Sequence, residues 1–116
     1  MSKIFKVGLI GCGHISETYF RAQEYFNNIR IVKCADINMD AAKKCAIHYN
    51  IEAVTVEELL KDKEIEIILN LTIPGAHYEV SKMAIENGKH SYAEKPLAIN
   101  FEDGKKIVEL AKEKNL

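Results

Sequence analysis

Short apolar runs alternate with segments of helical periodicity along the whole of this 116-residue sequence. The runs are rich in Val, Ile and Leu, whereas the segments between them carry apolar residues at three- and four-residue steps. These patterns predict strands over residues 5–10, 29–35, a short stretch before Thr55, 65–72 and 91–93, and helices over 14–26, 39–49, 55–60, 76–87 and from Asn100 onward. Such alternation is typical of parallel βαβ units.

The predicted fold class is therefore α/β, with a doubly wound parallel sheet of the Rossmann type between two helix layers. In the strand order of dinucleotide-binding folds, 3-2-1-4-5-6, the sequence has counterparts for the first five strands only. We expect residues 1–116 to form one nucleotide-binding domain that lacks the sixth strand, and hence to be a fragment of a larger protein.

The periodicity also predicts which side of each helix is buried. The expected buried residues are Ile15, Tyr19, Ala22 and Phe26 in the first helix, Ala42, Cys45, Ala46 and Tyr49 in the second, and Ile107, Val108 and Ala111 in the last. Helix ends are marked by the N-cap candidates Asn38 and Asn100, the capping-box pair Thr55 and Glu58, and the C-cap glycine Gly88.

Composition excludes several classes of partner. With 16 Lys and Arg against 17 Asp and Glu, the formal net charge is −1, so neither nucleic acid nor a membrane surface is expected to bind. The cysteines, Cys12, Cys34 and Cys45, have neither disulfide-framework nor metal-ligand spacing, and we expect packing residues and no metal site. The apolar run 7–12 is too short for a signal peptide, which favours a cytoplasmic location.

Residues 11–16, Gly-Cys-Gly-His-Ile-Ser, follow the first predicted strand and match the first two glycines of the dinucleotide-binding pattern G-x-G-x-x-G/A. Gly11 permits a tight turn, and Gly13 allows a pyrophosphate to approach the backbone. The helix start at His14 and Ile15 would attract the negative phosphates.

Asp36 lies 23 residues beyond Gly13 and follows the second predicted strand, where an acid accepts hydrogen bonds from the adenosine ribose. A carboxylate there repels a 2′-phosphate and no Arg follows it, so NAD is expected in preference to NADP. Lys43 and Lys44 lie further along the next helix and are expected to face solvent. FAD and S-adenosylmethionine sites share these features, so this half of the chain leaves both open.

Three segments in the second half carry a more specific pattern: residues 72–77 (TIPGAH), 87–90 (NGKH) and 93–98 (AEKPLA). In order and spacing they resemble the N-terminal half of the Gfo/Idh/MocA oxidoreductase family, the relatives of glucose–fructose oxidoreductase and inositol dehydrogenase. The resemblance covers essentially the whole chain, and the Glu-Lys-Pro motif is its most diagnostic part.

The resemblance implies roles for residues that follow the fourth and fifth predicted strands. Thr72, Pro74 and His77 would line the nicotinamide side of the cofactor. Glu94 would lie in the cofactor cleft, and Lys95 would reach the reacting hydroxyl or carbonyl oxygen as the catalytic residue. In such enzymes the peptide bond after this lysine is often cis.

The activity implied is hydride transfer between NAD and a sugar, a polyol or a related hydroxyl or carbonyl substrate. Family members continue into a C-terminal α+β domain that carries most of the substrate pocket and a histidine partner for the lysine. That domain has no counterpart in this sequence. We therefore expect this chain alone to be inactive and the full-length protein to form homo-oligomers through that domain. The alternatives are a non-catalytic dinucleotide-binding or regulatory module and, more remotely, a methyltransferase domain.

Overall fold

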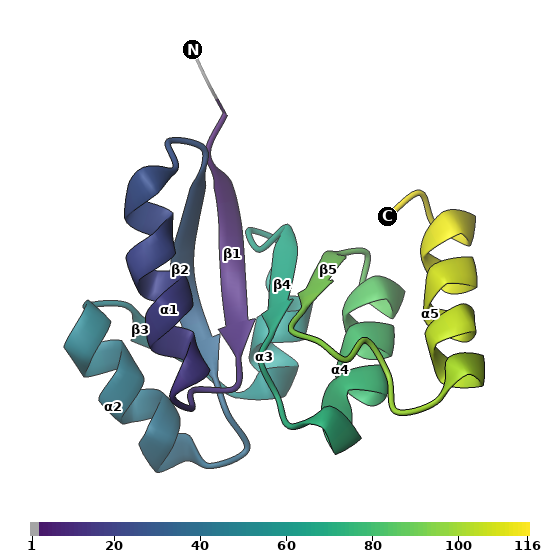
Figure 1. The fold of residues 1–116 in the computed structure, drawn as a ribbon. Helices are drawn as coiled ribbons and strands as arrows, with labels where there is room; N and C mark the ends of the chain where they lie inside the picture. Colours follow the sequence, from purple (N-terminus) through teal and green to yellow (C-terminus); the bar gives the residue numbers. More distant parts are fainter. Residues whose placement is uncertain (1–2) are drawn as a thin grey trace.

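The computed structural model describes residues 3–116 as a five-stranded, entirely parallel sheet with the order β3-β2-β1-β4-β5 (Figure 1). The strands are β1 (Phe5–Ile10), β2 (Ile29–Ala35), β3 (Glu52–Ala53), β4 (Ile67–Asn70) and β5 (His90–Ala93). The helices are α1 (Ile15–Ala22) with a following 3-10 turn η1 (Gln23–Tyr25), α2 (Met39–Tyr49), α3 (Val56–Lys61), α4 (Pro74–Glu86) and α5 (Phe101–Glu113). The predicted α/β class and strand order are confirmed.

Helices form a layer on each face of the sheet. On one face α1 and α2 bury Phe20, Cys45 and Ala46 against β1, β2 and β4. On the other face α3 and α4 bury Leu59 and Val80 against the same strands, and α5 packs beside α4 at the β5 end (Figure 1). No helix between residues 3 and 116 is long and apolar enough to cross a membrane.

The predicted helix starts are confirmed by their hydrogen bonds. Asn38 Oδ1 accepts from the Asp40 N–H at 3.0 Å, and Asn100 Oδ1 accepts from the Asp103 N–H at 2.9 Å. Thr55 begins α3 with a reciprocal capping box, in which the Glu58 N–H donates to Oγ1 at 3.0 Å. Local sequence therefore sets where these helices begin.

The buried side of α1 differs from the prediction. Ile15 and Phe26 are 41% and 51% exposed, and the buried residues are Ser16 and Phe20. The regular helix ends at Ala22, so Phe26 follows η1 in extended backbone and leaves the predicted stripe. Phe20 instead stacks on the Tyr49 ring of α2, with 3.8 Å between ring centroids.

The buried face of α5 is narrower than predicted, and the strand β4 is shorter. In α5, Ile107 is buried but Val108 is 45% exposed, because this helix packs beside α4 rather than over the sheet and needs a narrow apolar stripe. The fourth strand covers only Ile67–Asn70 of the predicted residues 65–72, the length over which it pairs with both β1 and β5. Ile65 and Leu71 flank it and remain buried.

Candidate functional site

The sequence-predicted site residues gather at the carboxyl edge of the sheet, because each follows the end of a parallel strand. Gly11 follows β1, Asp36 follows β2, Thr72 lies two residues after β4, and Glu94 follows β5. Helices leave β1 and β4 toward opposite faces, and these strands are neighbours. This edge is therefore the topological switch point, where doubly wound sheets bind their ligands.

The two glycines of the first turn differ in their surroundings. Gly11 has φ +103°, and a Cβ there would lie 2.5 Å from the backbone oxygen of Leu71. The fold itself therefore requires glycine at position 11. A Cβ on Gly13 would meet no atom of the protein within 4 Å, so Gly13 borders open space.

The start of α1 borders the same space. His14 occupies the N-cap position and is exposed, and no side chain caps the helix. The Ser16 hydroxyl donates to the Gly13 carbonyl at 2.6 Å and is buried, which gives the close packing expected of a small residue at the third position of the motif. The Ser16 and Glu17 N–H groups donate to the Gly13 and His14 carbonyls at 3.1 and 3.2 Å, and no side chain covers the positive end of the helix beside Gly13.

Asp36 joins this glycine turn to the end of β2. Its carboxylate accepts from the Cys12 N–H at 2.8 Å through Oδ2 and from the Asn38 N–H at 2.9 Å through Oδ1. Each oxygen keeps acceptor capacity for a ligand hydroxyl. Lys43 and Lys44 are exposed on α2, as predicted.

A buried amide that the sequence analysis missed supports the loop after β4. Asn70 is 0% exposed, and its Oδ1 accepts from both the backbone N–H (3.2 Å) and the hydroxyl (2.6 Å) of Thr72. Its Nδ2 donates to the His77 carbonyl at 3.0 Å and to the Ser81 hydroxyl at 2.9 Å. The sequence did contain a signal for this role: Asn70 is the polar residue of the otherwise apolar strand β4. A buried amide at such a position needs hydrogen-bond partners.

His77 links the loop after β4 to the loop after β5, and its side chain is too buried to contact a cofactor. Its side chain is 1% exposed, Nε2 lies 2.6 Å from the Thr72 carbonyl, and Nδ1 hydrogen-bonds the Pro96 carbonyl. Both ring nitrogens are thus occupied by the protein backbone. Pro74, at the first position of α4, remains exposed. Of the residues implied for the nicotinamide side, Thr72 and Pro74 keep accessible surface and His77 does not.

The Glu-Lys-Pro segment follows β5. Glu94 is half-buried, and its N–H donates to the Asn70 carbonyl at 3.0 Å, while its carboxylate accepts from the Tyr19 hydroxyl of α1. Lys95 is exposed, and the Lys95–Pro96 peptide bond is cis, as the resemblance implied. Across residues 3–116 the ammonium of Lys95 has no hydrogen-bond or ion-pair partner.

The Tyr19–Glu94 contact predicts a pH effect on stability. Burial, and then the hydrogen bond to Glu94, raise the pKa of Tyr19 from 10.0 to about 12. The folded state therefore holds the phenol proton more tightly than the unfolded state. This contribution is fully present below pH 10 and is lost as the pH rises through about 12. In urea titrations across this range, the free energy of unfolding should fall more steeply for the wild type than for Tyr19→Phe.

The matched control is Tyr25→Phe, which removes a phenol that is 87% exposed. Its unfolding free energy should follow the wild-type curve over the same pH range. Equal slopes for the wild type and Tyr19→Phe would contradict the proposed linkage.

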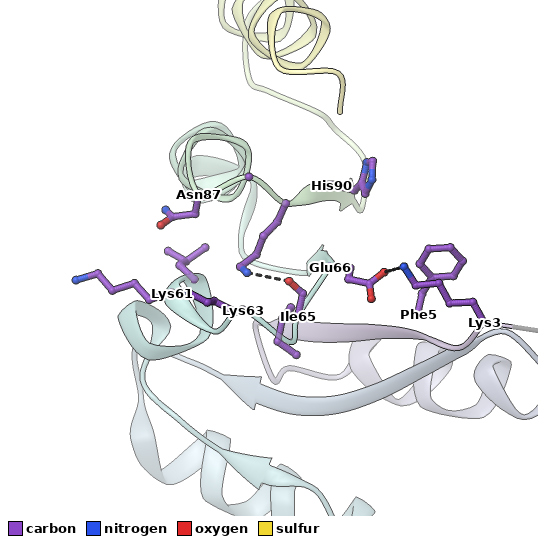
Figure 2. Close-up of a pocket in the computed structure, with 11 residues that line it drawn as sticks. Lys3, Phe5, Lys61, Lys63, Ile65, Glu66, Asn87 and His90 are labelled. Atoms are coloured by element: carbon purple, nitrogen blue, oxygen red, sulfur yellow. Dashed lines mark hydrogen bonds and ion pairs between the residues drawn. The ribbon is translucent and has the colours of Figure 1, made fainter.

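A cavity of about 610 Å³ lies at the opposite, amino edge of the sheet (Figure 2). Three of its four lysines, Lys3, Lys61 and Lys89, are engaged by neighbouring groups. Lys89 Nζ donates to the carbonyls of Asp62 (2.6 Å) and Ile65 (2.8 Å), and Lys3 pairs with Glu66 at 3.1 Å. The sequence-predicted site residues therefore have no part in this cavity.

A doubly wound sheet with a glycine turn at its switch point defines the dinucleotide-binding class of domain. The family model described as "Oxidoreductase family, NAD-binding Rossmann fold" (GFO_IDH_MocA) matches residues 5–116. The chain belongs to this family, as the motifs after β4 and β5 indicated.

Individual relatives agree with this assignment. The chain is 29% identical over 113 residues to an inositol 2-dehydrogenase/D-chiro-inositol 3-dehydrogenase of Lactiplantibacillus plantarum, covering 94% of this chain and 32% of that protein. It therefore spans about a third of the length of the curated relatives that it matches.

Two solved structures with high similarity hold different cofactors. The 3-ketoreductase KijD10 from Actinomadura kijaniata, in complex with NADP and TDP-benzene, superimposes with a TM-score of 0.92 at 26% identity, over 98% of this chain and 36% of that one. GenD2 from gentamicin A biosynthesis, in complex with NAD, superimposes with a TM-score of 0.93 over 100% of this chain and 34% of that one. At 17% sequence identity, this is a similarity of fold alone. The comparisons thus establish a nucleotide-binding domain of an oxidoreductase family, with NAD and NADP both represented.

Proposed function

We propose that this chain is the nucleotide-binding domain of an NAD-dependent oxidoreductase that moves a hydride between nicotinamide and a hydroxyl or carbonyl carbon of a sugar or polyol. One observation carries the proposal. The uncapped start of α1 and the open space at Gly13 adjoin the Asp36 carboxylate, an arrangement that fits a pyrophosphate and its adenosine ribose.

Each residue of the edge has a role in this proposal. Gly11 and Gly13 shape the pyrophosphate turn, and the first amides of α1, at His14 and Ile15, attract its charge. Asp36 accepts hydrogen bonds from the adenosine ribose hydroxyls. The open space at Gly13 is what a bound pyrophosphate needs and what the fold alone does not require.

The nicotinamide side is assigned to the loops after β4 and β5. Thr72 and Pro74 border the ring, and Glu94, held by Tyr19, faces the cleft. Lys95 hydrogen-bonds the reacting oxygen and holds or supplies its proton. When bound, the cofactor supplies the hydride chemistry, and the protein supplies position and charge.

NAD is proposed as the cofactor in preference to NADP. The Asp36 carboxylate lies where a 2′-phosphate would bring a second negative charge, and Lys43 and Lys44, the nearest cations on α2, point to solvent. The substrate class, a sugar or polyol, is proposed from the dehydrogenases that the chain resembles.

The complete catalytic site is proposed to need the remainder of the protein, through which we expect homo-oligomers to form. The exposed Lys95 supports this view, since no residue between 3 and 116 hydrogen-bonds or ion-pairs with its ammonium. The three free cysteines fit a cytoplasmic protein. A non-catalytic dinucleotide-binding module shares the same cofactor site, and addition of the remaining domain, followed by an activity assay, separates the two.

Titration with NADH and NADPH, followed by nicotinamide fluorescence, tests the cofactor proposal. The chain has no Trp, so the protein background is low. We expect the affinity for NADH to exceed that for NADPH by about tenfold or more, and tenfold corresponds to about 1.4 kcal/mol of binding free energy. Asp36→Ala should weaken NADH binding, because it removes the acceptor for the ribose hydroxyls. It should also bring the NADH and NADPH affinities closer together, because it removes the repulsion of the 2′-phosphate.

The control variant is Asp40→Ala, which removes an exposed carboxylate from the start of α2 and should leave both affinities unchanged. Equal affinities for NADH and NADPH in the wild type would contradict the NAD preference. A folded wild-type chain that binds neither nucleotide would contradict the site itself.

A further inference from the structure

The fold brings together three cysteines that are far apart in the sequence. Cys12 lies in the glycine turn, Cys34 in β2 and Cys45 in α2, yet their Sγ atoms all lie within 4.8 Å of one another. Cys34 and Cys45 are buried, whereas Cys12 is half-buried at the mouth of the cluster. All three are free thiols. Their sequence spacing gave no sign of this, because the cluster forms only when the turn, the strand and the helix pack.

This spacing is close to what one metal ion requires. Metal–thiolate bonds of about 2.3 Å place three sulfurs around a trigonal ion about 4 Å apart. Sulfurs already within 4.8 Å of one another can reach that spacing by small side-chain rotations. Two of the ligands lie on regular elements, and the third, Cys12, lies in the glycine turn.

The ligand set also selects the ion. Among residues 3–116 no histidine nitrogen or carboxylate oxygen belongs to the group, which offers three sulfurs and no fourth protein ligand. Zinc in structural sites takes four ligands, whereas monovalent copper is soft, favours thiolates and accepts three. We propose that Cys12, Cys34 and Cys45 form a binding site for a single Cu(I) ion.

Metal binding would displace the thiol protons. The Cys34 thiol donates to the Ala42 carbonyl at 3.4 Å, a bond that a metal–sulfur bond would replace. Cu(I) takes the place of the thiol protons, which pass to solvent, and no oxidation or reduction takes place.

The site is joined to the glycine turn through Cys12. The Cys12 N–H donates to Asp36 Oδ2 at 2.8 Å, and its thiol donates to the Ala35 carbonyl at 3.6 Å. An ion that holds Cys12 Sγ exchanges the latter bond for a metal bond and fixes the turn between Gly11 and Gly13. Copper loading is therefore expected to change dinucleotide affinity, and the two ligands must affect each other equally.

Competition with a chromophoric Cu(I) chelator, bathocuproine disulfonate, tests the site under anaerobic, reducing conditions. The folded chain should withdraw about one equivalent of Cu(I) from the chelator. Cys12→Ala should lower the Cu(I) affinity by about a hundredfold or more, because it removes one of the three ligands. Cys12 is half-buried in a turn, so this variant should remain folded, which circular dichroism checks.

His48→Ala is the matched control, because it removes the imidazole nearest in sequence to Cys45 while keeping all three sulfurs. Its Cu(I) affinity should equal that of the wild type. The proposal is overturned if the wild type withdraws no Cu(I), if Cys12→Ala binds equally well, or if Zn²⁺ is bound in preference to Cu(I). A disulfide in the metal-free protein, detected as a loss of about two mass units, would also overturn it. NADH titration of Cys12→Ala reports separately on the proposed cofactor site.

Discussion

Replacement of Gly11 by alanine is expected to lower the free energy of unfolding by about 3 kcal/mol or more, the sum of a left-handed backbone penalty and an overpacking cost. The residue has φ +103°, and the added Cβ would lie 2.5 Å from the Leu71 backbone oxygen. Leu71 cannot yield easily, since its N–H donates to the Ile10 carbonyl at 2.8 Å and its side chain is buried. Urea unfolding followed by circular dichroism measures the loss.

Gly13→Ala is the paired variant in the same turn. Its Cβ meets no atom of the protein within 4 Å, so its stability should match the wild type within about 0.5 kcal/mol. Its affinity for NADH should fall by about tenfold or more, because the methyl group occupies space that the pyrophosphate needs. Undiminished NADH affinity in Gly13→Ala would exclude this turn as the pyrophosphate site, and equal stabilities of the two variants would refute the steric argument.

The second large effect is expected at Asn70, where alanine should cost about 3 kcal/mol of unfolding free energy. Four hydrogen bonds are lost, each contributing about 0.5–1.5 kcal/mol, and their partners on Thr72, His77 and Ser81 are left without Asn70. The loop after β4 also loses its anchor. We therefore expect weaker NADH binding together with the lower unfolding midpoint, measured on the same preparation.

Ser81→Ala serves as the control for Asn70→Ala. It removes one of the four bonds, Asn70 Nδ2 to Ser81 Oγ, together with the donation from the Ser91 hydroxyl at 3.1 Å, and leaves both Thr72 contacts intact. Ser81→Ala should lower the free energy of unfolding by about 1–2 kcal/mol and change the NADH affinity little. If Asn70→Ala were no more destabilising than Ser81→Ala, the loop-anchoring role of Asn70 would be wrong.

Elements that depend on local sequence were predicted well. The caps at Asn38, Thr55 and Asn100 act through residues two or three positions away, so the sequence contains both partners. The alternation of strands and helices predicted a parallel, doubly wound sheet, and its strand order is the one taken from dinucleotide-binding folds. The glycine turn was predictable for the same reason, since it joins adjacent elements.

Features that arise between distant segments were not predicted. Phe20 is buried because Tyr49 of another helix stacks on it, and nothing in residues 14–26 marks it above Phe26. His77 follows the family motif, but its burial depends on the Pro96 carbonyl in a loop that arrives after β5. The cysteine cluster joins three elements in the same way. Such contacts depend on tertiary packing, which periodicity does not contain.

The contrast between Gly11 and Gly13 has a consequence for how this domain can diverge. A descendant that ceased to bind a dinucleotide would still need Gly11 to fold, whereas position 13 would be free to acquire a side chain, since the protein leaves space for it. A glycine retained at position 13 would then indicate that natural selection still maintains ligand binding. A glycine retained at position 11 would indicate only that the chain folds.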